Sequence, residues 1–239
     1  MITIFRLSIA LVLLITSCSC NFLFEGIAGK GPVKTLKISA LDDFDAIEAS
    51  RGLEVILEKS NTNDVMIEAN ENLLEIIDVY VSNNTLVITS KKNIFSADAK
   101  KVYVKFDGIQ RIEATSGSKV TNTAIIQERN MAITSSSGAS VKLQISSDNL
   151  SCDASSGAGV VLSGYANHLE ANSSSGSNIN TEEVDAAHIR ANASSGSNIT
   201  VHSKKSFRGD ASSGSSIRYS GNPEDVSESD SSGGSIRKI

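Results

Sequence analysis

Hydrophobic and polar residues alternate along most of the chain from residue 110 onward, and a Ser-Gly pair interrupts the alternation every 18–21 residues. Seven glycines mark these interruptions: Gly117, Gly138, Gly157, Gly176, Gly196, Gly214 and Gly233. A hydrophobic period of two predicts β-strands with one buried face. The constant separation of the glycines predicts that these strands belong to a repeated structural unit.

Each repeat carries a β-branched residue three positions after its glycine: Val120, Val141, Val160, Ile179, Ile199, Ile217 and Ile236. Residues that stand an odd number of positions from the glycine are mostly apolar or small, and residues at even positions are mostly polar. Identical offsets suit strands that stack in register at about 4.8 Å, whereas a β-sandwich would not require them. We therefore predict an all-β fold, a right-handed parallel β-helix of about 19–20 residues per coil. The right-handed sense of the coil follows from the strong preference for right-handed connections between parallel strands.

The Ser-Ser-Gly motif is interpreted as an architectural corner. Each coil must bend between the strand before the glycine and the strand after it, and a residue without a Cβ accepts the backbone angles of a tight bend. The short serines before the glycine are expected to bond along the stack or to the turn backbone. A nucleophilic serine would need a base beside it, and no His occupies a fixed offset near these serines.

Residues at even offsets are expected to face solvent in columns that run along the stack. Four of them, Asp153, Asn172, Asn192 and Asp210, precede their glycines by four residues and should line one exposed stripe. Asn178 and Asn198 should lie on the next face, and stacked amides of this kind can form hydrogen-bonded ladders. These six residues are the candidate binding face.

The segment 36–108 lacks the tight repeat but remains rich in alternating, strand-like sequence. Ser50-Arg51-Gly52 resembles a degenerate earlier corner, and "SNNT" at 82–85 indicates a hairpin turn between two strands. "NENLLEII" at 70–77 is compatible with one short helical turn. We therefore expect an irregular β-rich part that leads into the regular coils.

The first twenty residues contain one basic residue, Arg6, followed by an apolar run too short to span a bilayer. This pattern is typical of a secretory signal. The run ends in Ile15-Thr16-Ser17-Cys18, which resembles a bacterial lipobox and predicts a lipid anchor on Cys18. An ordinary cleaved signal is the alternative. The expected organisation is a signal peptide over 1–17, a linker over 18–35 and a single β-helix domain over 36–239.

Composition narrows the function classes. A hydrophobic content of 40% in 239 residues suffices for one sizeable core, and a net charge of −5 without a basic cluster argues against nucleic acid as a partner. Cys20 and Cys152 are far apart in sequence and indicate no disulfide framework. His168 and His188 both stand eight residues before their glycines and should be neighbours at about 4.8 Å. A third ligand is not evident, so neither a metal nor another cofactor is expected, and two exposed histidines are the simpler interpretation.

The order of motifs resembles the head GIN domain family, which groups autotransporter-type adhesins common among surface or periplasmic lipoproteins of Bacteroidetes. The resemblance rests on Phe44-Asp45-x-Ile47, the Gly52-x-Glu54-Val55 strand, the segment 68–74, the strand 85–88 and the serial Ser-Ser-Gly-Ser-x-Ile coils. It covers roughly residues 36–236. It implies a right-handed parallel β-helix and no catalytic site. Arg51 departs from the small residue that is usual at a tight corner.

Two functions from different classes fit these observations. The first is a lipid-anchored module of the cell envelope, in the outer membrane, that binds a glycan or protein partner through its polar wall without chemistry. The second is a β-helix enzyme that cleaves polysaccharides, which needs two carboxylates about 5–9.5 Å apart. Asp153 and Asp210 share a column but lie three coils apart, or about 14 Å, and this separation disfavours the enzyme. The sequence leaves the membrane face and the oligomeric state open.

Overall fold

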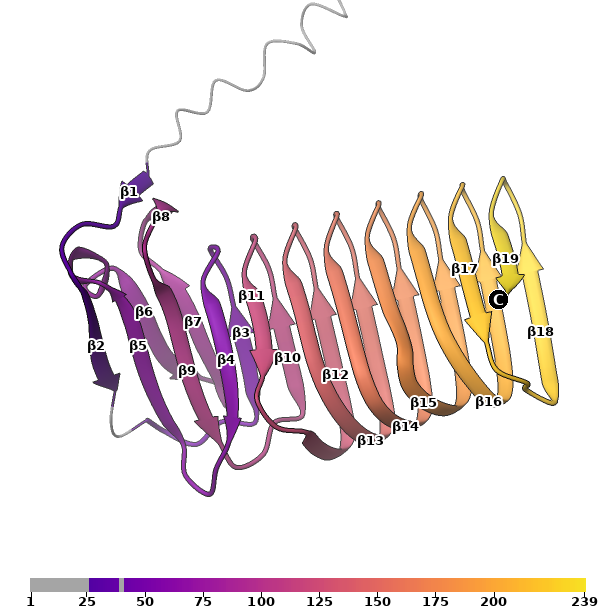
Figure 1. Ribbon diagram of the computed structural model, residues 1–239, viewed down its shortest axis with the longest axis horizontal. Coiled ribbons are helices and arrows are strands. Elements are labelled where there is room, and N and C mark those ends of the chain that lie inside the picture. The colour runs from indigo at the N-terminus through magenta and orange to yellow at the C-terminus, as the bar shows by residue number, and fades with distance from the viewer. Residues whose placement is uncertain (1–25, 39–40) are drawn as a thin grey trace, which may run out of the picture.

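The computed structural model describes residues 26–38 and 41–239 of the chain. The described part is all-β, and its only helical element is the 3-10 turn η1 (Glu71–Leu73). The strands form a rod of stacked coils that joins a curled, mixed sheet at the N-terminal end, with the C-terminus at the opposite end (Figure 1). The parallel β-helix expected from the sequence is therefore confirmed.

The regular coils are built from ten strands whose neighbours pair in parallel: β10 (Arg111–Ala114), β11 (Lys119–Asn122), β12 (Ile126–Ser135), β13 (Ser140–Ala154), β14 (Gly159–Ser173), β15 (Asn178–Ala193), β16 (Asn198–Ala211), β17 (Ser216–Ser220), β18 (Asp225–Asp230) and β19 (Ser235–Lys238). Strands β13 to β16 continue around a rounded bend from one Ser-Gly corner to the next. We call the strand segments that lead into a corner the pre-corner wall and those that leave it the post-corner wall.

The seven glycines all lie at the sharp corner, with φ between 70° and 77° except Gly196 at 69°. The serine before each glycine is left-handed as well, with φ of 50–53°, which the sequence reasoning missed. Two successive left-handed residues form a tight turn, closed by bonds such as Ser177 N to Ser174 O at 3.2 Å. The N–H of each glycine except Gly233, which lies in the last coil, donates to the serine carbonyl of the next coil at 3.0–3.2 Å, and these bonds tie the corners together.

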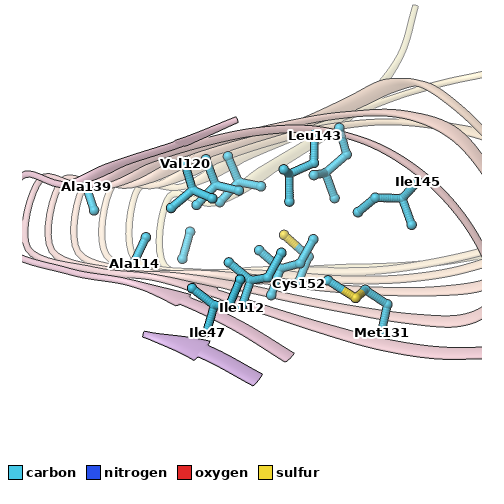
Figure 2. Packing of buried hydrophobic residues seen from close by; sticks show 14 of the residues in the cluster. Ile47, Ile112, Ala114, Val120, Met131, Ala139, Leu143, Ile145 and Cys152 are labelled. Carbon is cyan, nitrogen blue, oxygen red and sulfur yellow. The ribbon is translucent and has the colours of Figure 1, made fainter. Parts of the chain in front are cut away.

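The core tapers toward this corner (Figure 2). Small residues such as Ala114 and Ala139 fill the narrow end between the walls, whereas Met131 and Ile145 fill the wide end at the rounded bend. Ile47 and Ile112 are stacked in one column, as the register of the pre-corner wall requires. The inward residues are almost fully buried, so the predicted alternation of inward and outward side chains is confirmed.

Residues with small polar side chains satisfy backbone groups at the narrow end. Ser177, Ser197 and Ser215 directly follow their glycines and are buried. The Ser177 hydroxyl donates to the Ala154 carbonyl of the preceding coil at 2.9 Å, and Ser197 and Ser215 bond equivalently at 2.7 and 2.8 Å. The buried hydroxyls that bind the backbone therefore follow the glycine, whereas the sequence suggested those before it.

The N-terminal part contains nine strands: β1 (Gly26–Ala28), β2 (Val33–Ile38), β3 (Ala46–Ala49), β4 (Glu54–Lys59), β5 (Asp64–Asn70), β6 (Ile77–Ser82), β7 (Thr85–Ser90), β8 (Asn93–Ser96) and β9 (Lys100–Phe106). Strands β3 and β4 form a coil with its own corner, at which Arg51 (φ 56°) takes the place of the serine. The corner predicted at Ser50-Arg51-Gly52 is thus present, and Arg51 does not disturb it.

The coil made by β3 and β4 is paired on both sides by segments that follow it in sequence. Strands β7 and β9 lie against one side of it, and β10 and β11 lie against the other. The antiparallel strands β6, β5 and β2 then close the N-terminal end. The hairpin predicted at "SNNT" joins β6 to β7, with Asn83 and Asn84 both left-handed, and η1 provides the predicted helical turn.

Part of the segment expected as the linker takes part in strand pairing. The linker was expected to extend to residue 35, but Gly26–Ala28 pairs with β8 and Val33–Ile38 pairs with β5. The sheet therefore recruits residues that precede the expected start of the domain at residue 36, because β5 offers an open edge that β2 covers.

Candidate binding site

Four of the predicted site residues come together on the pre-corner wall. Asp153, Asn172, Asn192 and Asp210 are successive partners in the parallel register, one coil apart. They line a groove of about 550 Å³ together with the serines two positions further along each coil: Ser155, Ser174, Ser194 and Ser212.

The acid and amide side chains form a directional ladder along the groove. Asn192 Nδ2 donates to Asn172 Oδ1 at 2.7 Å, and Asn172 Nδ2 donates to Asp153 Oδ1 at 2.9 Å. The other carboxylate oxygen of Asp153 accepts a hydrogen bond from Ser151 at 3.3 Å. At the far end, Arg208 Nε lies 3.5 Å from Asp210 Oδ2. The expected amide ladder at Asn172 and Asn192 is therefore present.

The ladder leaves hydrogen-bonding capacity facing the groove. Each amide has two N–H groups and uses one of them within the ladder. Among the described residues, Asn192 Oδ1 and Asp210 Oδ1 have no hydrogen-bonding partner. The groove thus presents donors and acceptors at intervals of one coil.

Asn178 and Asn198 lie elsewhere. They are register partners at the start of β15 and β16, on the post-corner wall, and both are exposed. In the part of the chain that the structure describes, no side-chain hydrogen bond joins them. The six residues of the candidate face are therefore divided between two walls that meet at the corner ridge, and only four of them share a groove.

The column of outward side chains continues beyond the regular coils through Glu48, Val87 and Tyr80, which the sequence reasoning did not place there. Glu113 is the register partner of Thr134 on one side and of Glu48 on the other. Glu48 pairs with Val87, and Val87 pairs with Tyr80 on β6. A second hollow of about 420 Å³ lies over these residues and joins the same column. The column of outward side chains therefore runs from Tyr80 to Ser229 along the whole rod.

The pair Glu48 and Glu113 corrects one step of the sequence argument. The sequence argument weighed only the separation of Asp153 and Asp210 in this column and did not consider Glu48, which precedes Glu113 by a long insertion. The structure places them in adjacent coils, so their Cα atoms are about 4.8 Å apart. Neither carboxylate has a hydrogen-bonding or ion-pair partner among the described residues. The signal that could have found Glu48 was its offset of four residues from Gly52.

A second groove of about 670 Å³ lies on the same wall, nearer the rounded bend. Its floor is apolar, with Met131, Leu150 and Leu169, and one rim carries His168 and His188. The imidazoles are stacked with 5.0 Å between ring centroids, as their register predicts, and His188 Nδ1 lies 2.8 Å from Ser206 Oγ. No group of three or more His, Cys, Asp or Glu side chains is placed to hold a metal ion within residues 26–38 and 41–239.

The predicted lipidation site Cys18 lies outside the described residues, as does Cys20. Cys152 is buried in the core and unpaired, and burial raises the pKa of its thiol far above the ordinary value, so it remains protonated. Across the described ranges, no helix has the length and apolar character needed to cross a membrane.

Comparisons with known proteins agree with this architecture. Residues 43–223 match the sequence profile of a family described as "Putative auto-transporter adhesin, head GIN domain". No curated protein is significantly similar to the chain.

Several solved structures share the fold. A "putative adhesin" from Bacteroides fragilis superposes with a TM-score of 0.83 at 22% identity, over 90% of this chain and 100% of that one. A "putative lipid binding protein" from Parabacteroides distasonis superposes with a TM-score of 0.74 at 20% identity, over 90% of this chain and 100% of that one. A "putative adhesin" from Parabacteroides merdae gives 0.73 at 17% identity, over 90% and 99%.

Proposed function

Since the chain belongs to the head GIN domain family of autotransporter-type adhesins, a family of the cell surface or envelope, we propose that it is a lipid-anchored envelope module that binds its partner non-covalently. The proposed site is the groove lined by Asp153, Asn172, Asn192 and Asp210, which we call the ladder groove. The partner is a glycan or a protein, and no chemistry is performed on it.

The observation that carries this proposal is the unused hydrogen-bonding capacity of the ladder. The Asn192–Asn172–Asp153 chain fixes the side chains against one another, so little rotamer entropy remains to be lost when a partner binds. Each contact contributes only about 0.5–1.5 kcal/mol net. Affinity must therefore come from several coils acting together, or from many copies on one surface.

The test compares two sets of substitutions in the purified protein. One variant replaces Asp153, Asn172, Asn192 and Asp210 with Ala, and the matched control replaces Asn178 and Asn198 on the other wall. Both are applied to an array of immobilised glycans and to a parallel array of extracellular proteins that includes mucins. We expect wild type and control to bind members of at least one array and the ladder variant to lose that binding. Equal binding by the ladder variant and wild type would refute the site.

A second candidate function is retained because of Glu48 and Glu113. Retaining glycosidases use two carboxyl groups about 5–5.5 Å apart, and side chains from adjacent coils can reach that separation. An enzyme of this kind would lose turnover of a polysaccharide on Glu113→Gln while still binding it. Reducing-sugar assays of wild type, Glu48→Gln and Glu113→Gln on the glycans that bind would detect this. Turnover by wild type that either substitution abolishes would replace the binding function with an enzymatic one.

The anchor is proposed on Cys18, which follows the apolar run of the signal-like N-terminus. Several acyl chains hold a protein stably at a membrane, because each buried CH₂ contributes roughly 0.8 kcal/mol. Cys18→Ala is expected to release the protein into the soluble fraction of fractionated cells, whereas Cys20→Ala leaves it with the membranes. Mass spectrometry that finds no acyl group on wild-type Cys18 would contradict the anchor.

A further inference from the structure

We propose that the ladder groove and the hollow beside Tyr80 form one binding cleft for a linear, uncharged glycan that lies parallel to the axis of the rod. This inference rests on the proposed function, and it names the partner. It follows from the column of outward side chains that runs without interruption from Tyr80 on β6 to Ser229 on β18.

The length of the cleft suits a polymer. Ten side chains of the column are separated by nine strand spacings, which amounts to about 43 Å. The repeat of one coil is close to the length of one hexose unit in an extended, β-linked chain. A glycan along the axis would therefore meet an equivalent set of groups at each sugar, whereas a short ligand would use only part of the column.

The polarity of the cleft favours hydroxyl groups. The free N–H groups of Asn172 and Asn192 are donors, whereas Asn192 Oδ1 and Asp210 Oδ1 are acceptors. A sugar hydroxyl both donates and accepts, so it can satisfy either kind of group at every coil. A peptide bound to a sheet most readily adds to an open edge through its backbone. The cleft lies on the face of the sheet and offers no strand edge to such a peptide.

The charge of the cleft favours a neutral polymer. Glu48, Glu113 and Asp153 carry carboxylates that no basic side chain pairs within 4.0 Å among the described residues, and Asp210 is paired only with Arg208. Arg111 also lines the hollow, but its guanidinium donates to Thr85 Oγ1 at 2.9 Å, and one cation against four carboxylates leaves the cleft acidic. A polyuronate or a sulfated glycan would bring further negative charge against these groups, which costs free energy in a partly desolvated groove.

Tyr80 supplies an apolar surface at one end of the cleft. It is 45% exposed and lies in register with Val87, next to the two glutamates. Aromatic side chains dominate many binding sites because they offer a large rigid area at low entropic cost. The ring is placed to cover the C–H face of a terminal or near-terminal sugar.

The experiment measures affinity against length in the purified full chain. The probes are neutral β-1,3- and β-1,4-linked glucan and mannan oligomers of two to twelve units, with polygalacturonate and a sulfated glycan as charged competitors. We expect affinity for one of the neutral series to rise with length up to about nine units, the number of strand spacings, and then to level off. The charged polymers are expected to bind more weakly than any neutral oligomer of equal length.

A matched pair of substitutions tests the position of the ligand. Tyr80→Ala should weaken binding of the long oligomers about tenfold and leave dimers and trimers unaffected. Tyr165→Ala removes an equally exposed tyrosine on the rounded bend and should change neither. Thermal melting of both variants confirms that they fold.

Affinity that does not depend on length, a preference for the charged polymers, or equal effects of the two tyrosine variants would overturn the proposal. Binding confined to the protein array, and lost in the ladder variant, would overturn it as well while leaving the proposed binding function intact. If the ladder variant bound its partner as well as wild type does, the proposed function itself would be refuted.

Discussion

Ser135 is the one described residue with a fully buried side-chain oxygen that finds no hydrogen-bonding partner. It occupies the narrow end of the core, three residues before Gly138, and its register partners are Ala114 and Ala154. In the equivalent place two coils later, Ser173 Oγ lies 2.8 Å from Ser177 Oγ. The coil of Ser135 carries Ala139 where the other has Ser177, and this single difference leaves the Ser135 hydroxyl without a partner.

The expected effect of Ser135→Ala is a gain in stability. An unsatisfied buried hydroxyl costs about 1–3 kcal/mol, and the substitution removes that cost together with one small atom of packing. We expect a net increase of about 1 kcal/mol in the free energy of unfolding. For a chain of this size that corresponds to about 2–4 °C in the melting temperature. Ala139→Ser should give a gain of similar size by supplying the missing partner, and the two gains should not add, because each removes the same cost.

The matched control is Ser173→Ala, which breaks a hydrogen bond that exists. It should lower stability by about 0.5–1.5 kcal/mol, since Ser177 keeps its carbonyl acceptors. Circular dichroism melts and urea titrations of the three single variants and the Ser135→Ala/Ala139→Ser double variant provide the comparison. A loss of stability in Ser135→Ala as large as that in Ser173→Ala would show that the Ser135 hydroxyl is satisfied and that the reasoning is wrong.

Two further predictions concern the corner and the charged surface. Gly176→Val and Gly196→Val should each lower the free energy of unfolding by about 1–3 kcal/mol through backbone strain, because φ is near 70° at both glycines. Steric clash is not the cause, since an added Cβ would meet no atom within 4 Å. The control Gly159→Ala, on a strand with equal space, should leave the melting temperature unchanged. The hydrogen bond from Lys204 lowers the pKa of Asp185, so this pair stabilises the fold above the unfolded pKa of Asp185 and the contribution is lost as pH falls through the folded pKa. Lys204→Ala should therefore raise the pKa of Asp185 toward its ordinary value in an NMR titration, and an unchanged value would contradict the pairing.

The regular coils could be predicted because their information is local. The spacing of the glycines predicted the length of one coil, and the alternation of odd and even positions around each glycine predicted which side chains are buried. The shared position four residues before the glycine placed Asp153, Asn172, Asn192 and Asp210 in one column. The corner was only partly predicted. A tight bend at each glycine was expected, but the left-handed backbone of the serine before it was not, and the constraint is the positive φ of both residues.

The N-terminal end of the cleft could not be predicted because it depends on strand order. The corner at Gly52 was recognisable, and Glu48 stands at the same offset as Glu113. Nothing in the alternation of residues 60–108 shows that this insertion stacks on the outer side of the β3–β4 coil and leaves the inner side to β10 and β11. Tyr80 enters the column only through the antiparallel pairing of β6 with β7, which no repeat encodes.

The enclosed position of the β3–β4 coil has a consequence for the order of folding. Ala46 pairs with Thr85 on one side and with Arg111 on the other, whereas the coils from β12 onward pair with residues only 17–21 positions away. Closing a longer loop costs more chain entropy, and contacts between distant residues slow folding. A chain that emerges with its N-terminus first can pair β3 and β4 with β7 and β9 once residue 106 has followed, but their other side stays unpaired until residue 122 has followed. The regular coils, which carry the ladder, can meanwhile extend one at a time, so the end of the cleft that holds Tyr80 is completed by a separate, longer-range closure.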